Sequence, residues 1–292
     1  MEISLALGGG GVKGVAHIGV LRAIERNGFK LGALAGTSAG GLAGAIYLAG
    51  YAPDRMIEIF STIQKRGLFG HKSGEQPSIL GNARLEETLQ ELLGEREFHD
   101  LPIPFAVTAV DVKAGQAVVI DRGRIVDAVL ATTALPGIFP AREWGERLLV
   151  DGGITNPIPV SVAKGLKPGL PCIAVGLTQS MEEEAKPESI ASSLAPIPGI
   201  NMFSRLRIGQ AFQVFTRSLD ISSRLLAELK LEIDKPDLIV RPDVTDIGIL
   251  DQVDVEEIAL RGDKEIVRLL PELIKISSWQ RKLLNRIGLK IV

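Results

Sequence analysis

Cysteine and histidine are scarce in this sequence. Its 292 residues include one cysteine, Cys172, and three histidines, His17, His71 and His99. A single cysteine forms no internal disulfide, and the histidines do not cluster at the spacing of zinc ligands. Cys172 also begins an apolar run, which predicts a buried small side chain and not a reactive thiol. We therefore expect no disulfide, no metal site and no cofactor.

Excess charge of one sign and long hydrophobic runs are missing as well. The 33 Lys and Arg residues and the 35 Asp and Glu residues leave a net charge of −2, without the concentrated positive charge of nucleic-acid-binding proteins. No run of about 18 apolar residues occurs, and residues 1–7 carry no basic leader. We expect no nucleic-acid partner and a cytoplasmic location, at most peripheral at the inner membrane face. The oligomeric state is left open.

Apolar residues make up 46% of the chain and charged residues 23%, which is a globular composition. Runs typical of strands cover residues 3–7, 33–35, 105–110, 116–121, 147–150, 172–177 and 238–240. Helical periodicity covers residues 15–24, 39 to about 50, from Pro53 onward, 203–229 and 255–270. This alternation predicts an α/β fold, a three-layer α/β/α domain with a mostly parallel central sheet.

We expect a single domain over residues 1–270, with the motifs concentrated in residues 3–165. Residues 66–82 are rich in Gly, Ser and Pro and predict a loop over one edge of the site. Residues 178–201 are acidic near their start and rich in proline, which predicts disorder or a long flap.

The C-terminal segment, residues 271–292, is basic. Its stretch Lys275–Val292 holds five Lys and Arg residues, no acidic residue, and Trp279 among aliphatic side chains. A basic amphipathic helix with tryptophan suits peripheral contact with an anionic membrane. Packing against the core of the domain is the alternative.

Residues 36–40, Gly-Thr-Ser-Ala-Gly, match the G-x-S-x-G pattern of a nucleophile elbow. In such an elbow a serine stands at a tight turn between a strand and a helix, and small neighbours such as Gly36 and Gly40 allow the turn. The helix that begins near Ala39 directs its N-terminal amides at Ser38. The alternative is a glycine-rich helix start with Ser38 as an ordinary N-cap.

Residues 8–14, Gly-Gly-Gly-Gly-Val-Lys-Gly, follow the first predicted strand and open a helix, so backbone amides point at any bound anion. A dinucleotide site needs an acidic residue at the end of the second strand, which ends instead at Gly36. A P-loop needs Ser or Thr after its Gly-Lys, whereas Lys13 is followed by Gly14. An oxyanion hole remains, built from the amides of Gly9, Gly10, Gly11, Val12 and Ala39.

No histidine follows residue 99, so a triad in the order Ser, Asp or Glu, His lacks a candidate. A triad in another order, with His71 or His99 folded back to the serine, is the alternative. His17 lies on the helix after the glycine loop, where a packed structural histidine is the better interpretation. Asp151 follows the apolar run 147–150, and the next residues, Gly152 and Gly153, leave room for a neighbouring backbone. Carboxylates at strand ends are typical of sites in open α/β sheets. An ordinary Asp-Gly turn is the alternative.

Together these motifs resemble those of the bacterial patatin-like phospholipases. The resemblance includes residues 9–14, 36–40, 134–140 (Ala-Leu-Pro-Gly-Ile-Phe-Pro), 151–153 and 156–160 (Asn-Pro-Ile-Pro-Val). It implies a patatin-like α/β/α fold with a nucleophile elbow, a Ser-Asp dyad in place of a triad, no metal, and hydrolysis of acyl esters in lipids.

Carried over residue by residue, the resemblance makes Ser38 the nucleophile, Asp151 the general base, and the glycines at 9–11 the oxyanion hole. Plant members have an acidic residue where this chain has Gly8, and Lys13 replaces a frequent arginine. Lys13 steadies the loop or attracts a head-group phosphate; a solvated lysine is the alternative. A second acid at a strand end, Asp111, is interpreted as structural.

The resulting expectation is a serine acyl hydrolase that cleaves carboxyl esters of phospholipids or lysophospholipids through an acyl-enzyme. Two alternatives stay open. One is a catalytically silent lipid-binding regulator, and the other is an acyltransferase that uses the same nucleophile.

Overall fold

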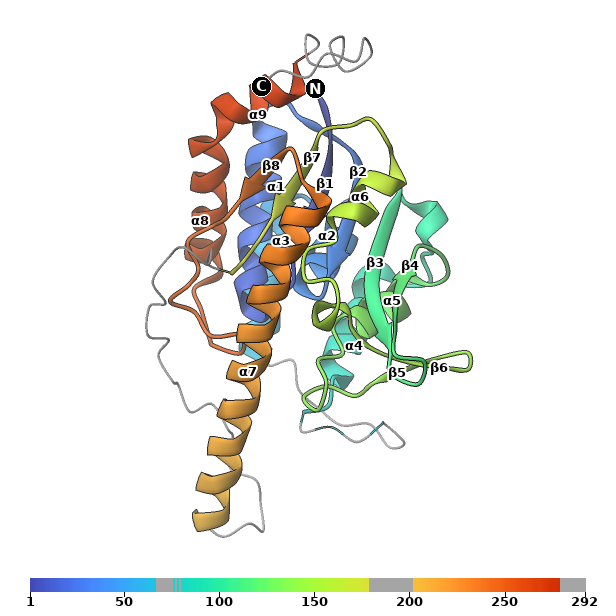
Figure 1. Ribbon diagram of the computed structural model, residues 1–292, viewed down its shortest axis with the longest axis vertical. Coiled ribbons are helices and arrows are strands. Elements are labelled where there is room, and N and C mark those ends of the chain that lie inside the picture. The colour runs from blue at the N-terminus through green and yellow to red at the C-terminus, as the bar shows by residue number, and fades with distance from the viewer. Residues whose placement is uncertain (67–75, 77, 79, 179–201, 279–292) are drawn as a thin grey trace.

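Eight β-strands form one sheet in the residues that the structure describes, which are 1–66, 76, 78, 80–178 and 202–278 (Figure 1). In this computed structural model the strand order is β5-β6-β3-β2-β1-β7-β8, and β4 pairs with β3. The strands are β1 (Glu2–Leu7), β2 (Lys30–Thr37), β3 (Phe105–Asp111), β4 (Gln116–Ile120), β5 (Arg142–Trp144), β6 (Arg147–Asp151), β7 (Cys172–Val175) and β8 (Leu238–Val240).

The centre of the sheet is parallel. β1 pairs in parallel with β2 and β7, β2 with β3, and β7 with β8. β4 and β6 are antiparallel to β3, and β5 is antiparallel to β6. The predicted mostly parallel sheet is confirmed, with its antiparallel strands confined to the side beyond β3.

The two faces of the sheet bury different side chains, because successive residues of a strand point to opposite faces. Leu5 of β1 belongs to the larger core cluster, and Ala6 belongs to a second one. Residues of α1 (Ala16–Arg26), α2 (Ala39–Leu48), α3 (Pro53–Arg66), α4 (Ala83–Leu93), α5 (Ile125–Thr132) and α8 (Val255–Arg268) complete the larger cluster. Residues of α6 (Val160–Leu166) and α7 (Met202–Asp234) complete the second. Helices therefore cover both faces, which confirms the three-layer architecture.

The C-terminal helices are packed onto this domain. A Cβ on Gly19 of α1 would lie 1.7 Å from the Ala259 oxygen, and one on Gly262 of α8 would lie 2.0 Å from the Ala16 oxygen, so only glycine allows this approach. Helix α9 (Leu270–Ser277) adds Leu273, which is fully buried in the larger cluster. The domain boundary expected at residue 270 thus falls at the start of a packed helix.

Several predicted elements are present with shifted ends. Helix α3 begins at Pro53, as predicted, whereas α7 continues to Asp234, beyond the expected residue 229. Helix α5 was not predicted, because all of its residues except Asp127 are buried and the sequence therefore lacks a clear amphipathic pattern. Most of the expected loop, the expected flap after Thr178, and residues 279–292 lie outside the described residues.

Candidate active site

Ser38 stands at the turn from β2 into α2 with a φ of 53° and a ψ of −121°. A positive φ is costly for a residue with a side chain and persists only where the surroundings impose it. A Cβ on Gly40 would lie 2.2 Å from the Leu7 oxygen, and one on Gly36 would lie 2.5 Å from the Gly41 Cα. The Ser38 side chain makes no capping hydrogen bond. This is the geometry of a nucleophile elbow, and the alternative of an ordinary N-cap is wrong.

The sheet register brings Asp151 to the level of Ser38. Thr37 at the end of β2 is paired with Thr108, and β3 continues three residues further. β6 pairs with this overhang, where Asp151 lies opposite Ala109. Antiparallel β6 begins beyond the carboxyl edge of the parallel strands and pairs only with this overhang, so its last residue, Asp151, lies level with the residue after Thr37. The sequence predicted a strand end at Asp151 but not the antiparallel direction of that strand.

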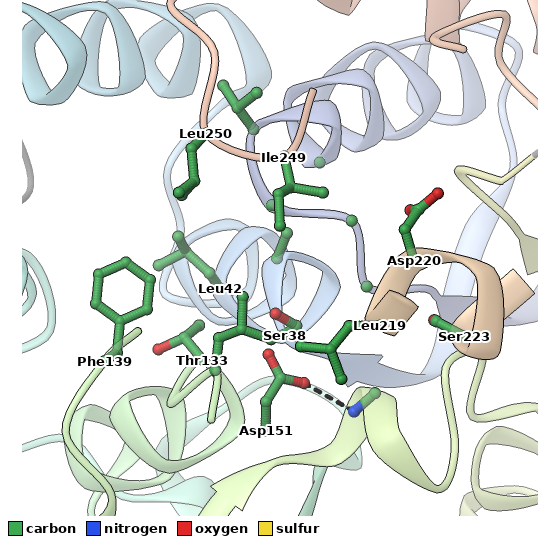
Figure 2. A pocket seen from close by; sticks show the side chains of 18 of the residues that line it. Ser38, Leu42, Thr133, Phe139, Asp151, Leu219, Asp220, Ser223, Ile249 and Leu250 are labelled. Carbon is green, nitrogen blue, oxygen red and sulfur yellow. Dashed lines mark hydrogen bonds between the residues drawn. The ribbon is translucent and has the colours of Figure 1, made fainter. Parts of the chain in front are cut away.

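Asp151 is 3% exposed, and its Oδ1 accepts a hydrogen bond from the Gly153 amide at 2.7 Å. Figure 2 shows its other carboxylate oxygen pointing toward the hydroxyl of Ser38. Burial is the dominant influence on Asp151 and raises its pKa to about 6, although hydrogen bonds from the Ser38 side chain and the Gly153 amide act in the opposite direction. The carboxyl group is therefore ionised at neutral pH, beside the serine whose proton a general base would accept.

Glycines let the chain approach closely around this pair. A Cβ on Gly152 would lie 2.2 Å from Thr108 Oγ1, and one on Gly153 would lie 3.1 Å from Asp151 Oδ1. A Cβ on Gly14 would lie 2.4 Å from the Ala39 Cβ, so the glycine loop rests directly on the elbow. The glycines of the sequence motifs therefore mark places where neighbouring segments approach closely, and at Gly152 and Gly14 they approach too closely for a side chain.

Two of the five amides expected in the oxyanion hole already have acceptors within the protein. The Gly9 amide donates to the Pro157 oxygen at 3.0 Å, and the Val12 amide donates to the Ile249 oxygen at 3.0 Å. An amide carries one proton, so the expectation is wrong for Gly9 and Val12. The amides of Gly10, Gly11 and Ala39 stay as predictions for this role.

His17 holds the glycine loop from beneath. The ring is fully buried, and its Nε2 lies 2.8 Å from the Gly8 oxygen, so Nε2 is the protonated nitrogen that donates. Burial lowers the pKa of His17 to about 4, which keeps the ring neutral. The structural interpretation of this histidine is confirmed. Lys13 is only 4% exposed, so the alternative of a solvated lysine is wrong.

A network of threonines beneath the elbow was not predicted. The Ser38 amide donates to Thr132 Oγ1 at 2.9 Å, and Thr132 Oγ1 donates to the Thr108 oxygen at 2.6 Å. Thr37 Oγ1 lies 2.7 Å from Thr108 Oγ1 and donates to the Asn156 oxygen at 2.8 Å. These contacts fix the strained backbone at Ser38. No motif marks them, because threonines are common and their partners are distant in the sequence.

A cavity of about 380 Å³ opens beside Ser38 and Asp151, within the range of small-ligand sites. Figure 2 shows Leu42, Phe139, Leu219 and Leu250 around the serine. The large apolar side chains that line the cavity are Val12, Val15, Leu42, Phe60, Ile63, Leu85, Leu135, Phe139, Ile154, Leu219, Leu226, Ile249 and Leu250. Helix α7 and the segment around Ile249, far from the motifs in sequence, thus complete the site.

His99 is not at this site. His99 has a side chain that is 75% exposed, and it lies 3.3 Å from Glu97 and 3.4 Å from Asp100, away from the cavity. His71 lies outside the described residues. Of the two histidines that the structure describes, neither lines the cavity, although His17 is one hydrogen bond from the glycine loop.

Cys172 and Asp111 have the structural roles that the sequence indicated. Cys172 is fully buried, and burial raises the pKa of its thiol to about 12. Asp111 Oδ1 accepts hydrogen bonds from the Lys113 amide at 3.0 Å and from the Leu148 amide at 3.3 Å. Among the described residues no group of three or more His, Cys, Asp or Glu side chains is arranged to hold a metal.

A strained serine turn facing a buried carboxylate at the edge of a mostly parallel sheet defines the class of α/β proteins with a nucleophile elbow. Within this class the chain belongs to the patatin-like phospholipase family, whose model matches residues 5–164. The matched range contains the glycine loop, the elbow and Asp151. In the part of the chain that the structure describes, we find no helix of the length and apolarity that crossing a membrane requires.

The chain is similar to parts of longer proteins. An uncharacterized NTE family protein of Mycobacterium tuberculosis is 33% identical over 181 residues, 61% of this chain and 50% of that protein. Lysophospholipase NTE1 of Mycosarcoma maydis is 28% identical over 173 residues, 56% of this chain and 9% of that protein. The crystal structure of VipD from Legionella pneumophila has a TM-score of 0.49 at 13% identity, and the match covers 91% of this chain and 66% of that one. The chain spans about half the length of the mycobacterial relative.

Proposed function

We propose that this protein is a serine acyl hydrolase that cleaves carboxyl esters of phospholipids or lysophospholipids. The observation that carries the proposal is the position of Ser38, strained and facing the buried carboxylate of Asp151 at an apolar cavity. An acyl chain fits such a lining, and the ester carbonyl then lies beside the serine. The name of the Mycosarcoma relative, a lysophospholipase, supports the same substrate class.

In the proposed mechanism the Ser38 oxygen attacks the ester carbonyl while Asp151 accepts the hydroxyl proton. The oxygen of the tetrahedral intermediate accepts hydrogen bonds from the amides of Gly10, Gly11 and Ala39. Asp151 then passes the proton to the departing alcohol, which leaves an acyl-enzyme on Ser38. Water attacks the acyl-enzyme while Asp151 accepts a proton from it, and Asp151 returns that proton to the Ser38 oxygen as the fatty acid is released. The pKa of about 6 suits both steps, since the group is ionised before the attack and protonated after it.

The test is covalent labelling of Ser38 by a fluorophosphonate, combined with hydrolysis of a p-nitrophenyl ester. Ser38→Ala should remove both signals, and Ser223→Ala, another serine that lines the cavity, should keep them. Absence of labelling in the unaltered protein would instead indicate a silent lipid-binding regulator. Formation of a new ester with an added alcohol or lysolipid, in excess of free fatty acid, would indicate an acyltransferase.

Peripheral contact of Lys275–Val292 with an anionic membrane is part of the proposal. The beginning of this stretch is packed, since Ile276 and Ser277 of α9 are buried. The test is therefore a chain that ends after Ser278, which keeps α9 complete. It should bind anionic vesicles more weakly while it hydrolyses a soluble ester at the parent rate.

A further inference from the structure

Helix α7 has an apolar face that is exposed to solvent. Val214 is 68% exposed, Ile221 53%, Leu225 44% and Leu229 56%. Spacings of seven and four residues place these side chains on one face of the helix. Single exposed apolar residues are common on protein surfaces, but four on one face of a helix favour an interaction surface.

The neighbouring face of the same helix belongs to the cavity. Leu219, Ser222 and Leu226 line it together with Ser38, and their spacing places them roughly a third of a turn from the exposed row. Ile154, just after Asp151, also lines the cavity and is 38% exposed, so the cavity reaches the surface near α7. A surface that covers the exposed row would therefore lie next to the entrance of the cavity.

The charge of α7 indicates what kind of surface that is. The excess of positive charge lies in the first half of α7: Met202–Leu219 contains Arg205, Arg207 and Arg217, three phenylalanines and no acidic residue. The following residues to Leu229 contain one arginine and two acidic residues, so they add no positive charge. Figure 1 shows this first half of α7 extending beyond the sheet and its covering helices. A helix that combines basic residues with an exposed apolar face suits the interface of an anionic bilayer.

We propose that the exposed face of α7, defined by Val214, Ile221, Leu225 and Leu229, docks on an anionic lipid bilayer and thereby presents the cavity entrance to membrane lipids. The apolar side chains enter the interface, and arginines such as Arg217 face the lipid head groups. The lipid that enters the cavity is the substrate of the proposed function, so the role of docking in substrate delivery rests on that function. The docking itself requires no catalysis.

The experiment measures sedimentation of the protein with vesicles of phosphatidylcholine and about 30% phosphatidylglycerol, which gives the vesicles a negative surface. Val214→Ser combined with Leu225→Ser removes two exposed side chains that do not line the cavity. Leu260→Ser combined with Val267→Ser is the matched control, since these α8 residues are 40% and 47% exposed. We expect the α7 variant to lose at least roughly tenfold in vesicle affinity, about 1.4 kcal/mol, and the control to bind like the parent. Both should hydrolyse a soluble ester at the parent rate.

Three outcomes would overturn the proposal. Unchanged vesicle binding by the α7 variant shows that this face does not dock on lipid, and a lowered Tm would then show that it packs within the chain. A parent dimer that becomes a monomer in the α7 variant shows an interface between copies. Equal loss in both variants shows nonspecific binding. The Ser38→Ala protein separates the two proposals, because it should bind vesicles like the parent even though it hydrolyses nothing. If the catalytic proposal fails, vesicle binding by the parent is still expected.

Discussion

The backbone amide of Ser38 donates a hydrogen bond to the side chain of Thr132 at 2.9 Å. The serine stands at the turn before α2, whereas the threonine is the last residue of α5, and its hydroxyl donates in turn to the Thr108 oxygen of β3. The contact therefore joins the strained turn to the sheet. Removing it frees the turn to relax, which makes Thr132 a positioning residue for the nucleophile.

Thr132→Val keeps the shape of the side chain but leaves the Ser38 amide without its acceptor. We expect kcat to fall about tenfold, as for a loss of roughly 1.4 kcal/mol, with KM nearly unchanged because the cavity is intact. Thr132→Ser restores the hydroxyl and should recover most of kcat. If Val and Ser variants have the same kcat, the hydroxyl does not position Ser38.

Asp151→Asn keeps the size of the side chain but removes the proton acceptor. Because general-base assistance contributes about 10²–10⁴-fold, kcat on a soluble ester should fall by that factor. His17→Gln and His99→Gln should keep most of the activity, since neither ring lines the cavity, and circular dichroism checks that each variant folds. A histidine variant that loses as much as Asp151→Asn would replace the dyad with a triad.

The raised pKa of Asp151 predicts an acid limb in the pH profile. The base works when ionised, so kcat/KM should be flat at neutral pH and fall through a pKa of about 6 as the carboxyl group becomes protonated. An unperturbed aspartate would give this limb near a pH of ~3.9. A profile that stays flat down to pH 5 contradicts burial as the dominant influence on this group.

The same shift predicts a cost in stability. A carboxyl group whose folded pKa lies above its unfolded value stabilises the fold in the protonated form, and this contribution is lost as pH rises through about 6. Asp151→Asn should therefore raise the free energy of unfolding at pH 8, by up to about 3 kcal/mol from a shift of roughly two pH units. The gain should shrink as pH falls toward 4. Urea titrations at pH 8 and pH 5 measure the difference, and a gain independent of pH would contradict it.

Gly40→Ala tests the close contact beneath the elbow. The added Cβ would lie 2.2 Å from the Leu7 oxygen, which is backbone and does not move aside easily. We expect a loss of about 3 kcal/mol in the free energy of unfolding, the upper range for overpacking. Gly165→Ala in α6 is the control, because nothing lies within 4 Å of its added Cβ, and it should gain about 0.5–1 kcal/mol from helix propensity. Equal stability of the two variants would contradict the steric argument.

Contiguous motifs gave the parts of the site that depend on local geometry. The pattern Gly36-x-Ser38-x-Gly40 determines a tight turn, because its small residues let a strand pass directly into a helix. The glycine loop likewise determines where backbone amides are exposed after the first strand. Alternating apolar runs and helical periodicity were sufficient for the three-layer architecture, since each pattern can bury its apolar side in only one kind of layer.

Tertiary structure decided which of these groups face one another and which are already occupied. Asp151 reaches Ser38 because β3 extends past β2 and pairs with an antiparallel β6. An apolar run predicts a strand but does not indicate whether that strand pairs in parallel or antiparallel. The Gly9 and Val12 amides are taken by the carbonyls of Pro157 and Ile249. Hydrogen bonds between residues so distant in the sequence follow from packing and leave no local pattern. For the same physical reason the sequence did not predict that α7 lines the cavity.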